Sequence, residues 1–352
     1  MAAAPPPPTM HIAIDAMGGD DAPRVIVEGA LSARDAAELI LVGDEPALRR
    51  ELSRQGVDSG TIPIVHAEEV VGMDEPAIAP IRRKRRSSIR LAAELVREGK
   101  AGAMVSAGNT GAVMIAAKMV IGTLAGVDRP ALAAVFPNRM GKTVLLDAGA
   151  NVDSKLEHLR QFAVMGHCYA QEVVGTPHPR IGLLSIGEEA SKGTDFTRQV
   201  FKVLEETGLN FVGNVEGRDL FEGTVDVVVC DGFVGNVVLK AAESLATLLT
   251  EMMREELDKS PATRLGGLLA RPAFERVRRR TDYREQGAAP LLGIDGGCFI
   301  AHGRSNARAI ESAIRRAAEF CAADLHGKIA DRLAELHRQE ARLLEQVSGP
   351  LS

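Results

Sequence analysis

The fold of this 352-residue chain is limited most by one repeated pattern: a short apolar segment, a polar glycine-rich turn and a helix with one apolar face. This alternation is typical of β-α-β units, which build a largely parallel sheet covered by helices. Apolar residues recur at helical spacing over residues 113–120, 159–166 and 238–245. The fold class is therefore expected to be α/β with a mostly parallel sheet. The predicted strands are residues 11–15, 39–42, 62–66, 103–106, 132–136, 143–147, 181–185, 210–212, 225–230 and 291–294.

Four of the predicted strands end in polar turns that contain glycine. These turns are residues 15–20, 106–111, 147–153 and 231–236. In an open parallel sheet the carboxyl ends of the strands share one edge, and ligands bind in the crevice at that edge. The four turns therefore predict a single large polar cleft.

The composition excludes several classes of protein. The chain has 45% hydrophobic and 25% charged residues, which is ordinary for a soluble globular protein. A net charge of -5, 3% aromatic residues and no tryptophan argue against a nucleic-acid-binding protein. No apolar run approaches the ~18 residues of a membrane-spanning helix. The most apolar helical stretch, residues 111–124, is interrupted by Lys118.

Short motifs for several common chemistries are absent from the sequence. The four cysteines, Cys168, Cys230, Cys298 and Cys321, lie far apart without a CxxC motif, so neither a disulfide framework nor a structural zinc site is expected. There is no GxxxxGK[ST] motif and no GxGxxG after a strand, so no nucleotide cofactor is indicated. There is also no GxSxG motif for a covalent acyl-enzyme.

The chain is expected to form one α/β domain over residues 10–325. Residues 1–9 are proline-rich, lack the features of a signal peptide and predict a disordered tail. Residues 256–287 are arginine-rich and predict a helical excursion from the sheet. Residues 326–352 predict a docked C-terminal helix and tail, although a coiled coil is the alternative.

Two segments could bind an anion such as phosphate. The turn at residues 106–111 precedes a helix, so backbone N–H groups near Gly108 and the side chains of Asn109 and Thr110 could donate hydrogen bonds. The alternative is that Asn109 or Thr110 only caps that helix. The cationic run 82–86 stands before Ser87 and Ser88 and could also bind an anion, or it could be a solvated surface.

Two loops carry acidic residues for which simpler roles are also open. Asp147, Asn151 and Asp153 could ligate a metal or anchor hydrogen bonds, and the alternative is a tightened turn with a capped helix. The loop 187–193 contains Glu188 and Lys192, and could equally be a surface turn.

Lys240, Asn236 and His302 are the candidates for catalysis. Asn236 and Lys240 follow Asp231 and share one helix face, where the lysine could reach a phosphate or polarise a carbonyl. The alternative for Lys240 is that it is only an exposed lysine at the start of a helix. His302 lies in a polar glycine-rich segment that leads into a helix, so it is the first candidate for acid–base work, although a structural role is equally open.

Six sequence blocks, taken together, resemble the PlsX-type acyl-carrier-protein:phosphate acyltransferases over about residues 10 to 322. The blocks are Asp15–Asp20, Val105–Ala112, Leu146–Asp153, Ile186–Gly193, Cys230–Lys240 and His302–Gly303. The resemblance implies a fold similar to isocitrate/isopropylmalate dehydrogenases and phosphotransacetylase, as an α/β/α sandwich with a projecting helical hairpin. It also implies that long-chain acyl-ACP and inorganic phosphate react to give acyl phosphate and ACP, at the start of phospholipid synthesis.

The resemblance further implies a cytoplasmic homodimer that associates peripherally with the membrane and requires no metal or cofactor. The acyl phosphate would pass to a membrane glycerol-3-phosphate acyltransferase. Phosphate itself is the nucleophile in this reaction, so the protein must position a dianion and stabilise an oxyanion. The residues expected to bind substrate or phosphate are Asp15, Gly18, Gly19, Arg82, Arg83, Lys84, Ser88, Gly108, Asn109, Thr110, Asp147, Asn151, Glu188, Lys192 and Asp231.

The arginine-rich excursion also acquires a role from the resemblance. Leu265, Leu268, Leu269 and Phe274 stand beside Arg276 and other arginines, which is typical of a membrane-surface element. ACP is acidic, so either this segment or residues 82–86 could instead dock the carrier.

Three other functions compete with this interpretation. An isopropylmalate-dehydrogenase-like oxidoreductase would need a metal-binding aspartate set, for which Asp147, Asp153 and Asp231 are candidates. A phosphotransacetylase would take acyl-CoA as donor. A membrane scaffold without activity would leave the polar turns unexplained.

Overall fold

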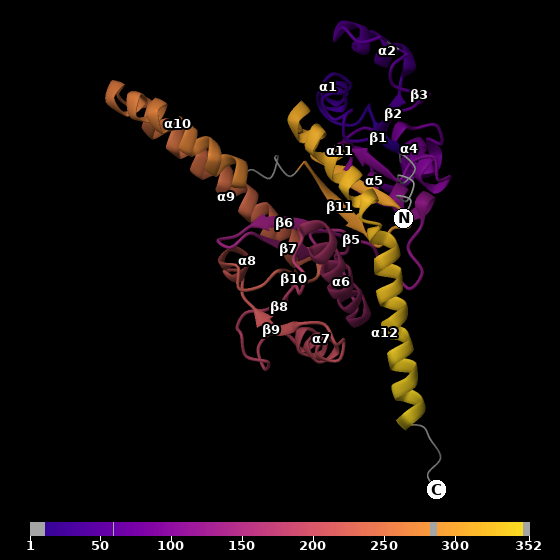
Figure 1. Ribbon diagram of the computed structural model, residues 1–352, viewed down its shortest axis with the longest axis vertical. Coiled ribbons are helices and arrows are strands. Elements are labelled where there is room, and N and C mark those ends of the chain that lie inside the picture. The colour runs from indigo at the N-terminus through magenta and orange to yellow at the C-terminus, as the bar shows by residue number, and fades with distance from the viewer. Residues whose placement is uncertain (1–10, 59, 282–286, 348–352) are drawn as a thin grey trace, which may run out of the picture. The chain divides into compact units, whose positions relative to one another are not determined.

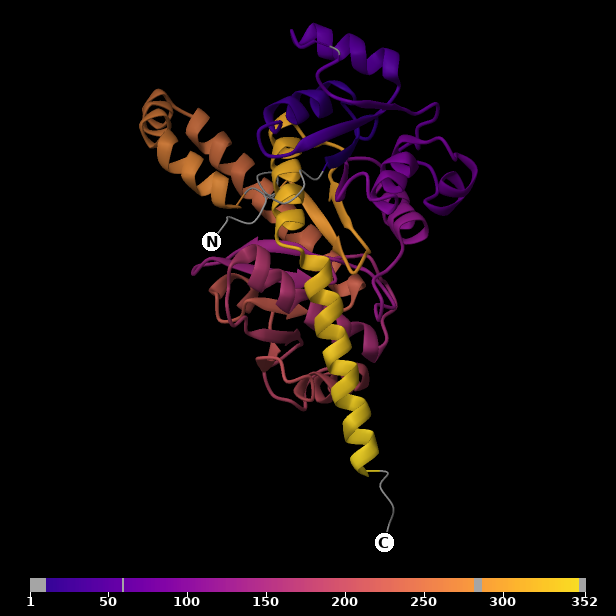
Figure 2. The same ribbon diagram turned by 45° about the vertical axis from the view of Figure 1, so that its right-hand side comes forward.

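The computed structural model describes residues 11–58, 60–281 and 287–347, and the predicted tail at residues 1–9 lies outside them. We expected one domain over residues 10–325. Within the chain there are two compact units, Met1–Pro130 with Gly287–Asp331 and Ala131–Gln286 with Arg332–Ser352. Figure 1 and Figure 2 show the elements of both.

The first unit is built on a twisted sheet whose strands follow the order β3-β2-β1-β4-β12-β11. All neighbouring strands are parallel except β11, which is antiparallel to β12. The strands are β1 (His11–Asp15), β2 (Glu38–Gly43), β3 (Ile64–His66), β4 (Ala103–Ser106), β11 (Ala288–Leu292) and β12 (Gly297–Ala301). Strand β12, with the sequence Gly297-Cys-Phe-Ile-Ala301, was not predicted.

The helices of the first unit bury its sheet. They are α1 (Arg24–Ser32), α2 (Glu45–Arg54), α3 (Ile78–Arg83), α4 (Ser88–Arg97), α5 (Thr110–Ala116), the π-helical turn η1 (Ala117–Ile121) and α11 (Ala307–Ala322). Helix α1 packs closely on α11 at Gly29, where a Cβ atom would lie 2.5 Å from the Ala307 carbonyl oxygen. Phe299 of β12 meets Phe320 of α11 edge-to-face at 5.4 Å between ring centroids.

The second unit has its own five-stranded sheet in the order β6-β7-β10-β8-β9, parallel except for β6. Its strands are β6 (Ala134–Pro137), β7 (Lys142–Leu146), β8 (Ile181–Leu184), β9 (Phe211–Val215) and β10 (Val227–Val229). The predicted strand 132–136 is two strands, because the short β5 (Ala131–Leu132) precedes β6.

The helices of the second unit are α6 (Leu156–Tyr169), the π-helical turn η2 (Ala170–Val174), α7 (Asp195–Glu205), α8 (Asp219–Glu222), α9 (Gly232–Asp258) and α10 (Pro261–Thr281). Helix α6 is its core helix, since Leu159, Phe162 and Met165 are fully buried. Gly166 lets α6 approach the sheet, because a Cβ atom there would lie 2.6 Å from Val227 Cγ1.

The presence of two sheets corrects the prediction that four polar turns share one sheet edge. The turns after β1 and β4 lie on the first sheet, and those after β7 and β10 lie on the second. Each pair of strands is adjacent and parallel, so each sheet brings two of the turns together.

The helical excursion begins earlier than the predicted residue 256. Helices α9 and α10 form a hairpin that turns at Lys259–Ser260, where the Ser260 hydroxyl accepts a hydrogen bond from Thr263 N at 3.1 Å. Both helices lie side by side in Figure 1 and Figure 2. The final helix, α12 (Leu325–Val347), buries Ile329, Leu333 and Leu336 of the predicted stripe.

Helix α9 also corrects the statement that no segment is apolar enough to span a membrane. An 18-residue window of α9 has a mean hydropathy of 1.3, and only 11% of that window is buried. By length and composition alone this helix could cross a bilayer. The same composition suits a surface helix that is covered by another apolar surface.

Candidate active site

Three turns meet at the carboxyl edge of the first sheet. Strands β1, β4 and β12 are neighbours and run parallel, so the segments after Asp15, Ser106 and Ala301 emerge side by side. The backbone N–H of Asp20 donates to the Gly303 carbonyl oxygen at 2.8 Å, which joins the first turn to the third.

Asp15 links the first two turns from below. Its carboxylate is buried and accepts a 2.6 Å hydrogen bond from the Ser106 hydroxyl, which in turn accepts one from Gly108 N at 3.1 Å. Burial raises the pKa of Asp15, and its hydrogen bonds partly oppose that rise. The structure therefore places Asp15 beneath the turns, where it fixes their spacing.

The glycines of these turns are required by close approach. A Cβ atom on Gly18 would lie 2.6 Å from both Asp15 Oδ2 and Gly108 N. Gly19 has a φ of 105°, a conformation that favours glycine. The structure thus brings Gly18, Gly19 and Gly108 together around one hydrogen-bonded carboxyl group.

Asn109 acts as a cap, the alternative left open by the sequence, and also as a tether. Its Oδ1 accepts from Ala112 N at 3.0 Å at the start of α5. Its Nδ2 donates to the carbonyl oxygens of Met73 at 2.8 Å and Glu75 at 2.9 Å. The neighbouring Thr110 is exposed as the first residue of α5.

The cationic run divides into an engaged lysine and exposed arginines. Lys84 Nζ pairs with Glu75 Oε1 at 2.6 Å and donates to the Val70 carbonyl oxygen at 2.8 Å, so it holds a loop. Arg82 and Arg83 end α3 and are exposed, and no ion pair is found for either of them within the described residues. Ser88 is buried at the start of α4.

His302 immediately follows β12 and is exposed. The structure brings it to the same sheet edge as Asp15 and Ser106, through the Asp20–Gly303 hydrogen bond. Its position suits a side chain that meets a bound molecule.

Asp147 is the most fully hydrogen-bonded carboxylate of the second unit. Its Oδ1 accepts from the backbone N–H groups of Leu132, Gly149 and Ala150, and its Oδ2 accepts from Asn151 N at 2.7 Å and Asn151 Nδ2 at 2.9 Å. Burial raises the pKa of Asp147, against the effect of these donors. The carboxylate is therefore a hydrogen-bond anchor. No group of three acidic, histidine or cysteine residues suitable for a metal occurs in the part of the chain that the structure describes.

The start of α9 lies against this anchored turn. Asp231 caps the helix by accepting from Val234 N at 2.9 Å. Gly235 is required because a Cβ atom there would lie 1.9 Å from the Asp147 carbonyl oxygen. Asn236 is exposed beside Gly149, where an added Cβ atom would lie 3.3 Å from Asn236 Oδ1.

Lys240 stands one turn after Asn236 and is half-exposed. Its Nζ pairs with Glu243 Oε2 at 2.9 Å, and Glu243 is mostly buried. The acidic partner keeps the ammonium group beside the first turns of α9. The predicted common face of Asn236 and Lys240 is present.

The loop 187–193 exposes Glu188 and Lys192 as a surface turn would. Glu188 pairs with Arg218 at 2.6 Å, while Lys192 is exposed. Gly193 is needed because a Cβ atom there would clash with Thr197 Oγ1.

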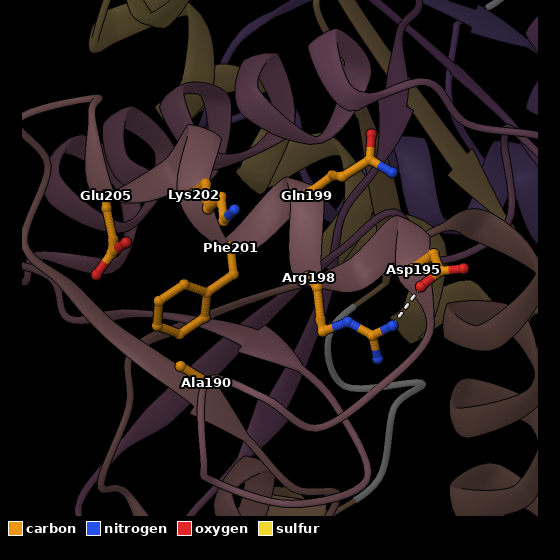
Figure 3. Close-up of a pocket in the computed structure, with 7 residues that line it drawn as sticks. All are labelled: Ala190, Asp195, Arg198, Gln199, Phe201, Lys202 and Glu205. Atoms are coloured by element: carbon orange, nitrogen blue, oxygen red, sulfur yellow. Dashed lines mark hydrogen bonds and ion pairs between the residues drawn. The ribbon is translucent and has the colours of Figure 1, made fainter.

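A surface pocket of about 490 Å³ lies elsewhere in the second unit, on α7 (Figure 3). Its Arg198 is paired with Asp195. Its lining includes none of the predicted site residues, so we do not assign the reaction to it. The lining residues are Ala190, Asp195, Arg198, Gln199, Phe201, Lys202 and Glu205.

Comparison with known proteins identifies the family. The profile of a family described as "Fatty acid synthesis protein" matches residues 10–328. A phosphate acyltransferase of Pelotomaculum thermopropionicum is 55% identical over 312 residues, which is 88% of this chain and 91% of that protein. Another from Trichlorobacter lovleyi is 51% identical over 328 residues, 93% of this chain and 95% of that protein. The chain belongs to the PlsX-type phosphate acyltransferase family.

Solved structures support the fold of a PlsX-type chain. A phosphotransacetylase from Streptococcus pyogenes matches 88% of this chain and 93% of its own, with a TM-score of 0.63 and 18% identity. A Salmonella typhimurium protein assigned to the 4-hydroxythreonine-4-phosphate dehydrogenases matches 88% of this chain and 99% of its own, with a TM-score of 0.50 and 15% identity. The expected likeness to phosphotransacetylase and dehydrogenase folds is confirmed.

Sequence reasoning missed two features of the site. Ser106 is the last residue of β4, and its position at the end of a strand was a usable signal for its contact with Asp15. The loop at residues 70–75, which Lys84 and Asn109 hold, carried no motif. Its role depends on contacts that are distant in sequence.

Proposed function

We propose that the chain transfers a long-chain fatty acyl group from acyl-ACP to inorganic phosphate, which gives acyl phosphate for phospholipid synthesis. The observation that carries this proposal is family membership over residues 10–328, together with relatives that are named phosphate acyltransferases. The glycine turns and exposed cations of the structure support it. They are the groups that an enzyme needs when its nucleophile is an anion.

The reaction needs no protein nucleophile. A phosphate oxygen attacks the thioester carbonyl carbon, the C–O bond forms, the C–S bond breaks, and the carrier thiolate leaves and takes a proton. The protein's tasks are to position the phosphate, to stabilise the oxyanion and to assist the leaving thiolate. Three of the cysteines, Cys168, Cys230 and Cys298, are buried, and burial raises the pKa values of Cys230 and Cys298, which suits a mechanism without a thiolate nucleophile.

Phosphate binding is assigned to the carboxyl edge of the first sheet. The turn between β4 and α5 supplies the glycine Gly108 and the polar side chains of Asn109 and Thr110, and Asn109 fixes the turn by capping Ala112 N. Arg82 and Arg83 supply exposed positive charge from α3. Asp15 and Ser88 lie beneath this edge as support.

Oxyanion stabilisation is assigned to Asn236 and Lys240 of α9. Both are exposed on one helix face, and the anchored turn around Asp147 fixes the start of that helix. His302 is assigned to proton delivery toward the leaving thiolate, since it is the exposed titratable side chain that follows β12.

The structure does not favour the oxidoreductase alternative, because two of its candidate metal ligands have structural roles. The Asp147 oxygens accept five hydrogen bonds, and Asp231 caps α9. Two of the three carboxylates that it required therefore already serve the fold.

The hairpin of α9 and α10 supports peripheral membrane association. Leu265, Leu268 and Leu269 are 60%, 64% and 77% exposed, and Phe274 and Arg276 are exposed near them. Apolar side chains flanked by arginine suit the surface of an anionic membrane. We further propose a cytoplasmic homodimer whose acyl phosphate product is consumed by a membrane glycerol-3-phosphate acyltransferase.

The experiment that tests the function is phosphate-dependent thiol release from palmitoyl-ACP, with palmitoyl-CoA in parallel. Lys240→Ala is expected to lower kcat about 100-fold, the usual effect of removing one oxyanion donor. Lys259→Ala is the matched control, because Lys259, which directly follows α9, also pairs with a glutamate three residues away. Equal release from CoA would identify a phosphotransacetylase, and no release from either donor would leave the scaffold alternative.

A further inference from the structure

The loop at residues 70–75 is attached to the phosphate edge of the first unit at several points. Lys84 Nζ bonds the Val70 carbonyl oxygen and the Glu75 carboxylate, and Gly72 N donates to the same carboxylate at 2.7 Å. Asn109 Nδ2 bonds the carbonyl oxygens of Met73 and Glu75. A surface loop with so many polar attachments has a defined position.

The attachments hold apolar side chains at the surface. Met73 is 42% exposed and Val70 is 39% exposed. Ile78, which follows the loop at the start of α3, is 51% exposed. Exposing apolar side chains to water is unfavourable, and the polar contacts keep these side chains at the surface. A bound apolar group would cover them.

Met73 reaches the site itself. A Cβ atom on Gly303 would lie 2.6 Å from Met73 Cε and 3.3 Å from Asp20 Oδ1. Gly303 follows His302, and its carbonyl oxygen bonds Asp20 N. The loop therefore contacts the turn that begins α5 on one side and the segment after β12 on the other.

We propose that Met73 is a specificity-determining residue that contacts the acyl chain beyond its fourth carbon. Asn109 and Lys84 are positioning residues that hold Met73 there. This inference rests on the proposed function, because an acyl chain must lie next to the carbonyl that phosphate attacks. The flexible, polarizable methionine side chain suits a chain that adopts several conformations.

The test compares palmitoyl-ACP with butyryl-ACP. Met73→Gln keeps the length of the side chain but makes it polar, and it is expected to lower the palmitoyl-to-butyryl ratio of kcat/KM about tenfold. Phosphate KM is expected to stay within twofold. Met140→Gln, at an 82% exposed methionine of the second unit, is the control and should leave the ratio unchanged.

A second pair of variants tests the positioning residue. Asn109→Ser keeps an N-cap acceptor but loses the donor bonds to the carbonyl oxygens of Gly72, Met73 and Glu75, so it should lower the same ratio. Asn306→Ser is the matched control, because Asn306 caps α11 by accepting from Ala309 N at 2.9 Å. Thermal unfolding of both variants shows whether Asn109→Ser retains the fold, and Met73→Gln decides the inference if it does not.

Several results would overturn the inference. An unchanged palmitoyl-to-butyryl ratio in Met73→Gln would do so. This includes an equal loss of kcat/KM with both donors, because an equal loss indicates general disruption of the site. Binding of an uncleavable hexadecyl thioether of ACP gives a readout without turnover, and Met73→Gln should weaken it about tenfold. Wild-type protein that binds this thioether through Met73 but releases no thiol would refute the proposed function while supporting the acyl contact.

Discussion

At the residue scale, Asp147 organises the turn on which α9 begins. Asp147→Ala removes the acceptor of five hydrogen bonds and leaves buried N–H groups unsatisfied. We expect it to destabilise the protein by about 3 kcal/mol, measured by urea unfolding. Asp153→Ala, at an exposed position of the same turn, should change stability by less than ~0.5 kcal/mol. Equal effects of the two substitutions would contradict the anchoring role.

Asp15 predicts a pH dependence of stability. Burial raises its pKa in the folded state, so the folded protein holds this proton at pH values where the unfolded chain has lost it. Its contribution to stability is therefore present below the unfolded pKa of about 3.8 and falls as pH rises through the folded pKa.

The measurement for Asp15 compares wild type with Asp15→Asn by urea unfolding between pH 4 and pH 7. The stability of the variant relative to wild type should rise as the pH increases, because asparagine has no proton to lose. A relative stability that falls with pH would show that the carboxylate form is the favoured one.

At the scale of elements, two glycines in helices predict opposite effects of the same substitution. Gly29→Ala on α1 forces a Cβ atom to 2.5 Å from the Ala307 oxygen and should destabilise the first unit by about 1–3 kcal/mol. Gly266→Ala on α10 has open space around the Cβ atom and should stabilise the hairpin by about 0.5–1 kcal/mol. Thermal unfolding measures both, and a destabilising Gly266→Ala would show that the hairpin is not helical at that position.

The α9–α10 hairpin also predicts membrane binding. Leu269→Gln removes an apolar side chain that can bury itself in the interface, at about 1.5–3 kcal/mol for full burial. We expect at least a tenfold weaker association with anionic phospholipid vesicles in sedimentation assays. Met140→Gln serves as the control, and equal binding of both variants would assign another surface to the membrane.

The elements themselves were largely predictable from local sequence, with clear exceptions. Strands such as β1 and β4 were found because an apolar run ends in a polar turn within a few residues. Strand β12 was missed, although its apolar run also ends in a polar turn. The start of the hairpin was misplaced, because α9 continues unbroken from Gly232 to Asp258, past the predicted boundary at residue 256.

At the scale of the whole molecule, the polar turns could be predicted from the sequence, but their distribution over two sheets could not. Parallel strand pairing joins segments that are far apart in sequence, as β12 with β4 or β10 with β7, and periodicity contains no information on partners. The polar turns were therefore assigned to one edge, whereas two sheets carry two each. The tethering role of Asn109 also depends on distant contacts, because Met73 and Glu75 are 36 and 34 residues away from it in the sequence.

The most direct measurement of the central claim follows the acyl group to its acceptor. Purified protein is incubated with palmitoyl-ACP and ¹⁸O-labelled phosphate, and the products are analysed by mass spectrometry. The account predicts palmitoyl phosphate that retains all of the label, formed in equal amount to the free ACP thiol. Thiol release that gives only free palmitate, or an acyl group found on the protein, would contradict direct attack by phosphate.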